Sequence, residues 1–214
     1  MGLIDTYDTL DALPASLRIY GASDYATMEA RAGKREPDYT EHGVWGMDSV
    51  GDLWAVDWWS GQAETDKSIA AFIRLVRQWK PIRWFNEGGV IDKAIGPAIR
   101  RAMVEAQAFV AIESIPSLSD KSVKLQAFHA RATAKTIHIP IRERWAENLI
   151  EQLVKFPAGR WDDKADVCGL IGRGVDQMMG ADIPLAIKRP ELIPFTGAWL
   201  EYDDKSRVPE VRYF

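Results

Sequence analysis

Four acidic residues of this 214-residue chain stand at the ends of predicted strands and helices, where side chains are free to do chemistry. Asp24 ends the first predicted strand, Glu87 ends a later one, and Asp163 and Asp166 open the last long predicted helix. The two helical aspartates are three residues apart, so they share one helical face. Because strand ends at one edge of a sheet converge, we expect these acids to meet, with Asp162 as an alternative member of the cluster.

Carboxylates gathered in this way repel one another and raise each other's pKa unless a cation neutralises them. Oxygen ligands without cysteine or histidine suit Mg²⁺ or Mn²⁺. Two such ions, about 3.5–4 Å apart, can activate a water and stabilise the leaving oxygen during phosphodiester hydrolysis. The pattern therefore predicts a metal-dependent nuclease site. Helix capping is the competing interpretation of Asp163 and Asp166, and a solvated turn is that of Asp24.

Basic residues offer a way to hold DNA beside such a site. The formal net charge of −4 argues against a uniformly basic surface, so phosphate contacts must come from a local patch. Lysine and arginine side chains neutralise phosphates and make DNA binding salt-dependent. A solvated basic helix face is the competing interpretation. The predicted DNA-binding residues are Lys121, Lys124, Arg131 and Lys135.

Composition excludes several other classes of protein. Hydrophobic residues make up 47% and charged residues 27% of the chain, which is the balance of a folded globular domain. The single cysteine, Cys168, excludes an intramolecular disulfide and a cysteine zinc cluster. No apolar run approaches the roughly 20 residues of a membrane span, so we expect no membrane association.

The elements that must position the acids follow from hydrophobic spacing and turn residues. Three antiparallel strands are predicted first, at 17–23, 43–47 and 53–59, the last two joined by a short polar loop that contains glycine. Helices and strands then alternate, which favours a mixed α/β sheet with helices on both faces, the topology of ribonuclease-H-like nucleases. The later predicted strands are at 82–85, 108–112 and 136–139, and the last of these is predicted to lie at an edge of the sheet. The predicted helices run from Thr65 or Asp66 to Lys80 and over 92–107, 119–134, 142–155 and 163–179.

Several motifs, taken in order, resemble the nuclease domain of the large terminase of tailed bacteriophages over roughly residues 17–180. GASDYA at 21–26 is similar to that family's first strand end, and DYT at 38–40 to the start of its hairpin. NEGG at 86–89 resembles its second acidic motif. Three further runs resemble the family's C-terminal motifs: KSVKLQAFHAR at 121–131, IHIP at 137–140 and FPAGRWDDKAD at 156–166.

The resemblance implies an endonuclease that cuts concatemeric double-stranded viral DNA during genome packaging. Asp24, Glu87 and one or both helical aspartates would then be the ligands of two Mg²⁺ or Mn²⁺ ions. The family usually has alanine after its last aspartate, whereas Val167 follows Asp166 here. This departure leaves open which acid of the 162–166 cluster is the third ligand.

The same resemblance implies partners, a location and a division of the chain. No phosphate-binding GxxxxGK[ST] loop is present, so the chain resembles the nuclease domain alone, either as a piece of a longer protein or as a naturally separate chain. The terminase ATPase domain, the small terminase subunit and the portal would be partners, in the cytoplasm of the host. We divide the chain into a lead-in segment at 1–16, a nuclease domain at 17–180 and a C-terminal tail at 181–214.

Two other functions fit the same residues. A Holliday-junction resolvase-like nuclease would also use acids at a first strand and a last helix, and a preference for four-way junctions over linear duplex would distinguish it. A non-catalytic DNA-binding or portal-docking module would carry the acids without a metal. In such a module Phe195, Trp199 and Tyr202 of the tail could dock another packaging protein.

Overall fold

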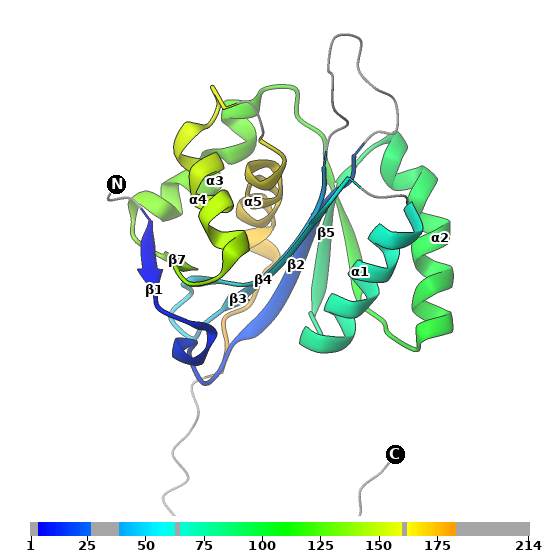
Figure 1. Cartoon of the computed structure of the whole chain (residues 1–214), viewed down its shortest axis with the longest axis horizontal. Coiled ribbons are helices and arrows are strands. Elements are labelled where there is room, and N and C mark those ends of the chain that lie inside the picture. The colour runs from blue at the N-terminus through cyan, green and yellow to red at the C-terminus, as the bar shows by residue number, and fades with distance from the viewer. Residues whose placement is uncertain (1–3, 27–38, 63–64, 160–161, 183–214) are drawn as a thin grey trace, which may run out of the picture. The chain divides into compact units, whose positions relative to one another are not determined.

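A computed structural model describes residues 4–26, 39–62, 65–159 and 162–182 of the chain (Figure 1). The chain divides into two units, Met1–Ile183 and Pro184–Phe214, and the description below concerns the first. The three tail aromatics named above and Asp38 of the DYT motif lie outside the described residues.

Seven strands form one mixed sheet in the order β1-β7-β4-β3-β2-β5-β6. β2, β3 and β4 are antiparallel neighbours, as predicted, and the other strand pairs of the sheet are parallel. Parallel neighbours require long crossover connections, which the helices provide. The strands are β1 (Asp5–Tyr7), β2 (Arg18–Asp24), β3 (Thr40–Met47), β4 (Leu53–Gly61), β5 (Arg83–Gly88), β6 (Ala111–Pro116) and β7 (Ile137–Pro140).

Helices cover both faces of this sheet, with α1 and α2 on one face and α3, α4 and α5 on the other (Figure 1). The predicted mixed α/β sheet between two helical layers is therefore confirmed. No helix in the described part of the chain combines the length and the apolarity needed to cross a membrane. The helices are α1 (Thr65–Trp79), α2 (Val90–Ala106), α3 (Lys121–Thr133), α4 (Arg144–Lys155) and α5 (Asp163–Gly174), with two short 3-10 helices, η1 (Leu10–Ala12) and η2 (Val175–Gln177).

Each helical layer packs on its own hydrophobic core. The apolar face of α1 is buried against the sheet, and Phe72 contacts Trp84 of β5 edge to face at 4.8 Å between ring centroids. On the other face Phe128 of α3 meets Trp45 of β3 at 5.5 Å. A fully buried side chain of this size contributes about 1.5–3 kcal/mol, so each aromatic pair strongly fixes a helix to the sheet.

The predicted strand at 136–139 exists, but its assignment to the sheet edge was wrong. β7 lies between β4 and β1, and β1 is a strand of the lead-in segment that we did not predict. β5 also extends through Glu87 into the predicted glycine loop, because Asn86–Gly88 pairs with Ser114–Pro116 of β6. These boundaries depend on the partner strand rather than on local propensity, which is why spacing alone did not find them.

A buried histidine occupies the core beneath α1 and α2. His42 is wholly inaccessible, its Nδ1 lies 2.7 Å from Ser23 Oγ, and its Nε2 lies 3.1 Å from the Ser68 carbonyl oxygen. Its ring stacks on Trp59 at 5.1 Å between centroids. Burial lowers the pKa of His42 to about 4, so the folded protein keeps this ring neutral.

Acid should therefore destabilise the fold through His42. The unfolded chain protonates this residue near its ordinary pKa of 6.5, whereas the folded chain protonates it near 4. Its stabilising contribution is complete above pH 6.5 and is lost as the pH falls toward 4, by about 3 kcal/mol in total. Urea unfolding from pH 7 downward measures this loss. His42→Gln should remove that part of the pH dependence, and His129→Gln, at an exposed position, should keep it. A pKa near 6.5 for His42 by NMR titration of the folded protein would contradict this account.

Candidate active site

Side-chain alternation along β2 and β5 brings two of the predicted acids onto one face of the sheet. Tyr20 and Ala22 of β2 pack in the core beneath α3, α4 and α5, and Asp24 continues that alternation at the strand end. Phe85 of β5 belongs to the same core, so Glu87 follows it onto that face. β2 and β5 are parallel and in register up to the residues just before these acids. Asp24 and Glu87 are therefore neighbours across adjacent strands.

The first turn of α5 supplies the other two acids. α5 begins at Asp163, with Asp162 at the N-cap position, and packs on β2 and β3. The backbone N–H of Tyr39 donates to Asp163 Oδ2 at 3.5 Å, and that of Asp166 donates to the Asp162 carbonyl oxygen at 2.9 Å. Because the N-terminal end of a helix favours carboxylates, this turn can hold two negative charges beside the sheet.

The four acids are close enough to change the protonation of Asp24. Burial raises the pKa of Asp24 well above its usual range, and the charges of Asp166, Asp163 and Glu87 raise it further. Three separate segments of the chain thus place carboxylates in one cluster, which we call the acid cluster: Asp24, Glu87, Asp163 and Asp166. Their mutual repulsion is the main electrostatic feature of the site.

Lys124 in the first turn of α3 supplies a positive charge to the acid cluster. Its Nζ lies 2.8 Å from Glu87 Oε1 and 4.0 Å from Asp166 Oδ1. Burial lowers the pKa of Lys124, but the hydrogen bond to Glu87 and the charges of Asp166 and Asp24 outweigh burial and raise the pKa. This lysine was predicted as a phosphate contact, and the structure places it among the acids themselves.

Glu87 favours its ionised form, whereas Asp24 favours its protonated form. Burial raises the pKa of Glu87, but hydrogen bonds from Lys124 and from Ser117 Oγ, the latter at 2.7 Å, lower it below its usual value. The charge of Arg173 acts in the same direction. Two neighbouring carboxyl groups whose pKa values are pushed apart are a common mark of an active site.

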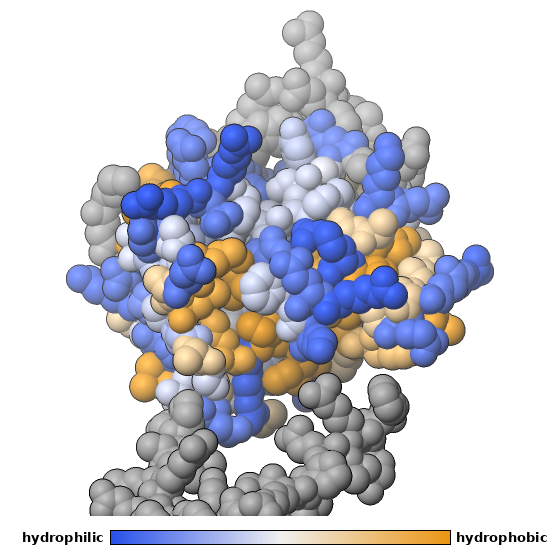
Figure 2. All heavy atoms as spheres, turned by 60° about the horizontal axis from the view of Figure 1, so that its bottom comes forward, coloured by the Kyte–Doolittle hydropathy of each residue, from blue (hydrophilic) through white to orange (hydrophobic). Residues whose placement is uncertain are grey.

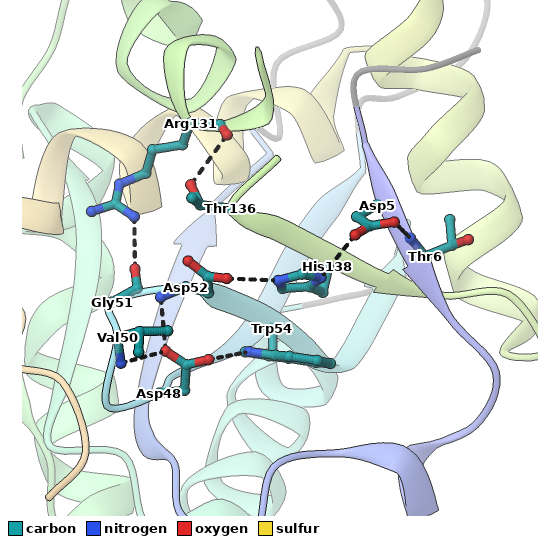
Figure 3. Close-up of polar contacts among 10 residues, drawn as sticks. All are labelled: Asp5, Thr6, Asp48, Val50, Gly51, Asp52, Trp54, Arg131, Thr136 and His138. Carbon is teal, nitrogen blue, oxygen red and sulfur yellow. Dashed lines mark hydrogen bonds and ion pairs between the residues drawn. The ribbon is translucent and has the colours of Figure 1, made fainter. Parts of the chain in front are cut away.

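Arg131 and Lys135 lie at and beyond the end of α3 opposite to Lys124. Arg131 donates from its guanidinium to the Gly51 carbonyl oxygen at 2.8 Å, at the turn between β3 and β4 (Figure 3). Lys135 is exposed just after α3. Lys121 begins α3, but its side chain is outside the described residues. Lys124 is therefore the predicted DNA-binding residue for which the structure records contacts with the acids.

A second polar cluster lies at the opposite end of the sheet, where β3 turns into β4 (Figure 3). His138 Nε2 lies 3.1 Å from Asp52 Oδ2, and its ring stacks on Trp54 at 4.0 Å between centroids. Trp54 Nε1 in turn donates to Asp48 Oδ2 at 3.0 Å. These contacts join β7 to the β3–β4 turn, so we interpret this cluster as structural.

The same end of the sheet exposes apolar side chains between hydrophilic ones, as the face brought forward in Figure 2 shows. Val50 lies in the β3–β4 turn, Ile82 precedes β5, Phe109 precedes β6 and Met179 follows η2. The acid cluster lies at the other ends of these strands. The acid cluster therefore lies at the end of the sheet away from these apolar side chains and from the His138 cluster.

The donor chemistry of the acid cluster fits a hard divalent cation. Within the residues that the structure describes, no three His, Cys, Asp or Glu side chains are arranged so that they could hold a metal ion as they stand. Carboxylate oxygens are nevertheless the ligands that Mg²⁺ and Mn²⁺ prefer, and a cation would relieve the repulsion that raises the pKa of Asp24. The Lys124 ammonium, near both Glu87 and Asp166, already relieves part of it.

Three members of the site were not predicted from the sequence. Ser117 and Arg173 act on Glu87, and the backbone of Tyr39 binds Asp163. Ser117 directly follows β6, which runs parallel to β5. The rule that gathered the acids at the strand ends could therefore have found it. Arg173 lies in the same helix as Asp163 and Asp166 but far from Glu87 in the chain, and no sequence signal indicates that α5 brings it to Glu87.

No protein-family model and no curated protein matches the chain. Solved structures do match. The large terminase nuclease from thermophilic phage G20c with bound magnesium has a TM-score of 0.51 and 14% identity, over 75% of this chain and 82% of that one. The Mn-soaked human cytomegalovirus terminase nuclease domain has a TM-score of 0.52 and 12% identity, over 81% and 90%. The Thermus phage P74-26 large terminase nuclease domain has a TM-score of 0.51 and 11% identity, over 78% and 84%.

The chain has the ribonuclease-H-like fold of terminase nuclease domains. This confirms the predicted fold class. The likeness extends over most of the chain and of each matched structure, so it is a likeness of whole domains rather than of a shared motif.

Repulsion within the acid cluster should make the metal-free protein less stable than it would be without Asp24. A carboxyl group whose pKa is raised by folding contributes most to stability at low pH. This contribution falls as the pH rises above the ordinary pKa of the group. Asp24→Asn should therefore stabilise the metal-free protein at pH 7, by on the order of 1 kcal/mol, which is about 2–4 °C in Tm. The gain should vanish in acid, where Asp24 is protonated. Thermal unfolding in EDTA measures it, with Asp176→Asn, at an exposed position, as the unaffected control. An Asp24→Asn midpoint at or below that of the wild type at pH 7 would contradict the repulsion.

Proposed function

We propose that this chain is a metal-dependent endonuclease that cleaves concatemeric double-stranded viral DNA during genome packaging. The observation that carries the proposal is the meeting of Asp24, Glu87, Asp163 and Asp166 at one end of a sheet with the fold of terminase nuclease domains. Neither part would suffice alone, because a fold supports many functions and acid clusters also occur in structural roles.

The acid cluster would hold two Mg²⁺ or Mn²⁺ ions, with Asp162 as an alternative ligand to its neighbours in α5. Bound there, the ions would supply the Lewis acidity and the water activation that phosphodiester hydrolysis needs. Asp24 and Glu87 would anchor the ions to the sheet, and the first turn of α5 would close the site from the helix side. The proposal is supported by the magnesium-bound and manganese-soaked states in which two of the matched structures were solved.

The Lys124 side chain would leave the acids and contact the DNA. In the metal-free protein its ammonium is bound to Glu87, and a divalent ion at the acid cluster would compete with it for the same carboxylates. Released from Glu87, the side chain can reach a phosphate oxygen from the first turn of α3. A phosphate held there would be oriented toward the acids, which is the positioning that hydrolysis requires.

The DNA would be held through its backbone. We propose that Lys121, Lys124, Arg131 and Lys135 contact successive phosphates along α3. Phosphate contacts set the position of the duplex without reading its sequence, so weak sequence preference is expected. Arg131 can contribute only after its guanidinium leaves, or shares, the Gly51 carbonyl oxygen.

The proposed partners follow from the same function. A packaging nuclease would work beside a terminase ATPase domain, the small terminase subunit and the portal, in the cytoplasm of the host. Free concatemeric DNA in that compartment would be the substrate.

Nicking of supercoiled plasmid tests the proposed activity. The wild type should nick plasmid with Mg²⁺ or Mn²⁺ and should be inactive in excess EDTA. Asp24→Ala and Glu87→Gln should each slow nicking by about 100-fold or more, because each removes charge that stabilises the transition state through a bound ion. Asp176→Asn should act like the wild type, and circular dichroism should show that all variants are folded.

Nicking that persists unchanged in EDTA would exclude the proposed mechanism. Strong preference for four-way junctions over linear duplex would favour a Holliday-junction resolvase-like nuclease. A folded wild type that binds no Mn²⁺ at millimolar concentration would favour a non-catalytic DNA-binding or portal-docking module.

Lys124→Met should separate metal binding from DNA binding. Without the competing ammonium, Mn²⁺ should bind more tightly in the absence of DNA, by about tenfold, because the carboxylates lose their internal cation. DNA should bind more weakly, and the slope of log K against log salt should fall by about one, as expected for one lost phosphate contact. Calorimetry and fluorescence anisotropy measure the two effects. Weaker Mn²⁺ binding, or an unchanged salt slope, would contradict this role of Lys124.

A further inference from the structure

A buried ion pair joins the first turn of α5 to β3, on the strand next to Asp24. Lys164 Nζ in the first turn of α5 lies 2.9 Å from Glu41 Oε2 in β3, and the two side chains are 4% and 2% exposed. Charges so deeply buried are costly unless each is paired and fully hydrogen-bonded. A pair of this kind restricts the elements that carry it to a narrow range of relative positions.

Both partners of the ion pair have further polar contacts. Trp58 Nε1 of β4 donates to Glu41 Oε2 at 2.6 Å, and Ser60 Oγ donates to the same oxygen at 2.5 Å. Lys164 Nζ also bonds to Ser60 Oγ, and it lies 4.9 Å from the centroid of a Trp58 ring. The carboxylate and the ammonium therefore each have several partners, on two adjacent strands.

The main chain of the same residue is fixed as well. The backbone N–H of Lys164 donates to Gln152 Oε1 of α4 at 2.9 Å. This N–H belongs to the first turn of α5, where backbone donors have no partner within the helix. One residue thus joins the start of α5 to β3 and β4 through its side chain and to α4 through its backbone.

This anchor has a direct bearing on the acids. Lys164 directly follows Asp163 and is two residues before Asp166, and Glu41 is the register partner of Asp24 across β2 and β3. The charges of Asp163 and Asp166 oppose that of Asp24, so electrostatic repulsion drives the first turn of α5 away from the sheet. A hydrophobic contact would oppose that force with little directional preference, whereas an ion pair with fixed donors holds the turn in one place.

We propose that the Lys164–Glu41 ion pair positions Asp163 and Asp166 opposite Asp24, and so sets the spacing of the acid cluster for its divalent ions. The part of this inference that concerns divalent ions rests on the proposed nuclease function. Lys164 and Glu41 are positioning residues, because they act through the aspartates of α5. Both side chains are buried, with Trp58 and Ser60 as neighbours.

The test compares two double variants, each of which replaces one lysine by methionine and one glutamate by glutamine. Lys164→Met with Glu41→Gln removes both buried charges and keeps an oxygen to accept from Trp58 and Ser60, so no unpaired charge remains to unfold the chain. Lys155→Met with Glu151→Gln makes the same changes in an exposed pair of α4, whose side chains are 61% and 53% exposed. Lys164→Arg preserves the charge and serves as the conservative variant.

Hydrogen exchange of the metal-free proteins is the primary measurement. The amides of Lys164 and Asp166, which bond to Gln152 Oε1 and to the Asp162 carbonyl oxygen, should exchange about tenfold faster or more in the buried double variant. Amides later in α5, such as that of Ile171, should keep their protection. The exposed double variant should exchange like the wild type, and Lys164→Arg should retain most of the protection.

Metal affinity is the second measurement. Loss of groups that orient metal ligands weakens binding by about 10–100-fold, so calorimetry should detect that loss of Mn²⁺ affinity in the buried double variant and none in the exposed one. Unchanged exchange at Lys164 and Asp166, or a uniform increase over the whole sheet and all of α5, would overturn the inference. A wild type without Mn²⁺ affinity would instead refute the proposed nuclease function, and the exchange comparison would still decide whether the ion pair holds the turn.

Discussion

Negative charge gathered at one end of a sheet is the constraint on which the rest of this structure depends. Asp24 and Glu87 leave adjacent strands on the same face, and Asp163 and Asp166 approach them from the start of α5. Repulsion among these carboxylates raises the pKa of Asp24, and it works against the packing of α5 on the sheet. A fold that brings them together needs positive charge close by.

Two lysines meet that need in different ways. Lys124 lies among the acids, bonded to Glu87 at 2.8 Å and partly exposed. Lys164 lies next to the acids in α5, in a buried pair with Glu41 that is shielded from solvent. In the proposed function, a divalent ion would replace the Lys124 charge, and the Lys164–Glu41 pair would keep the acids in place. The opposite face of the sheet contrasts with this arrangement, because its buried His42 is neutral.

The matched terminase nuclease structures are only 11–14% identical to this chain, yet they share its fold over most of their length. Sheet packing requires apolar side chains of suitable size at alternate positions, which many sequences satisfy. A metal-dependent site requires few residues, but each must have a particular chemistry and place. Low identity is therefore compatible with a retained fold, and the function has to be tested at the four acids and their two lysines.

The sequence by itself determined the local elements and the identity of the candidate acids. Alternation predicted β2, β3 and β4, helical spacing predicted α1, and strand ends and helix starts indicated Asp24, Glu87 and the aspartates of α5, because these patterns reflect burial along one segment. Only the tertiary structure decided which segments meet. The pairing of β1 with β7, the entry of Lys124 into the acid cluster and the burial of Lys164 against Glu41 each join residues far apart in the chain. Such contacts depend on the packing of whole elements against one another, and a periodic pattern within one element does not contain that information.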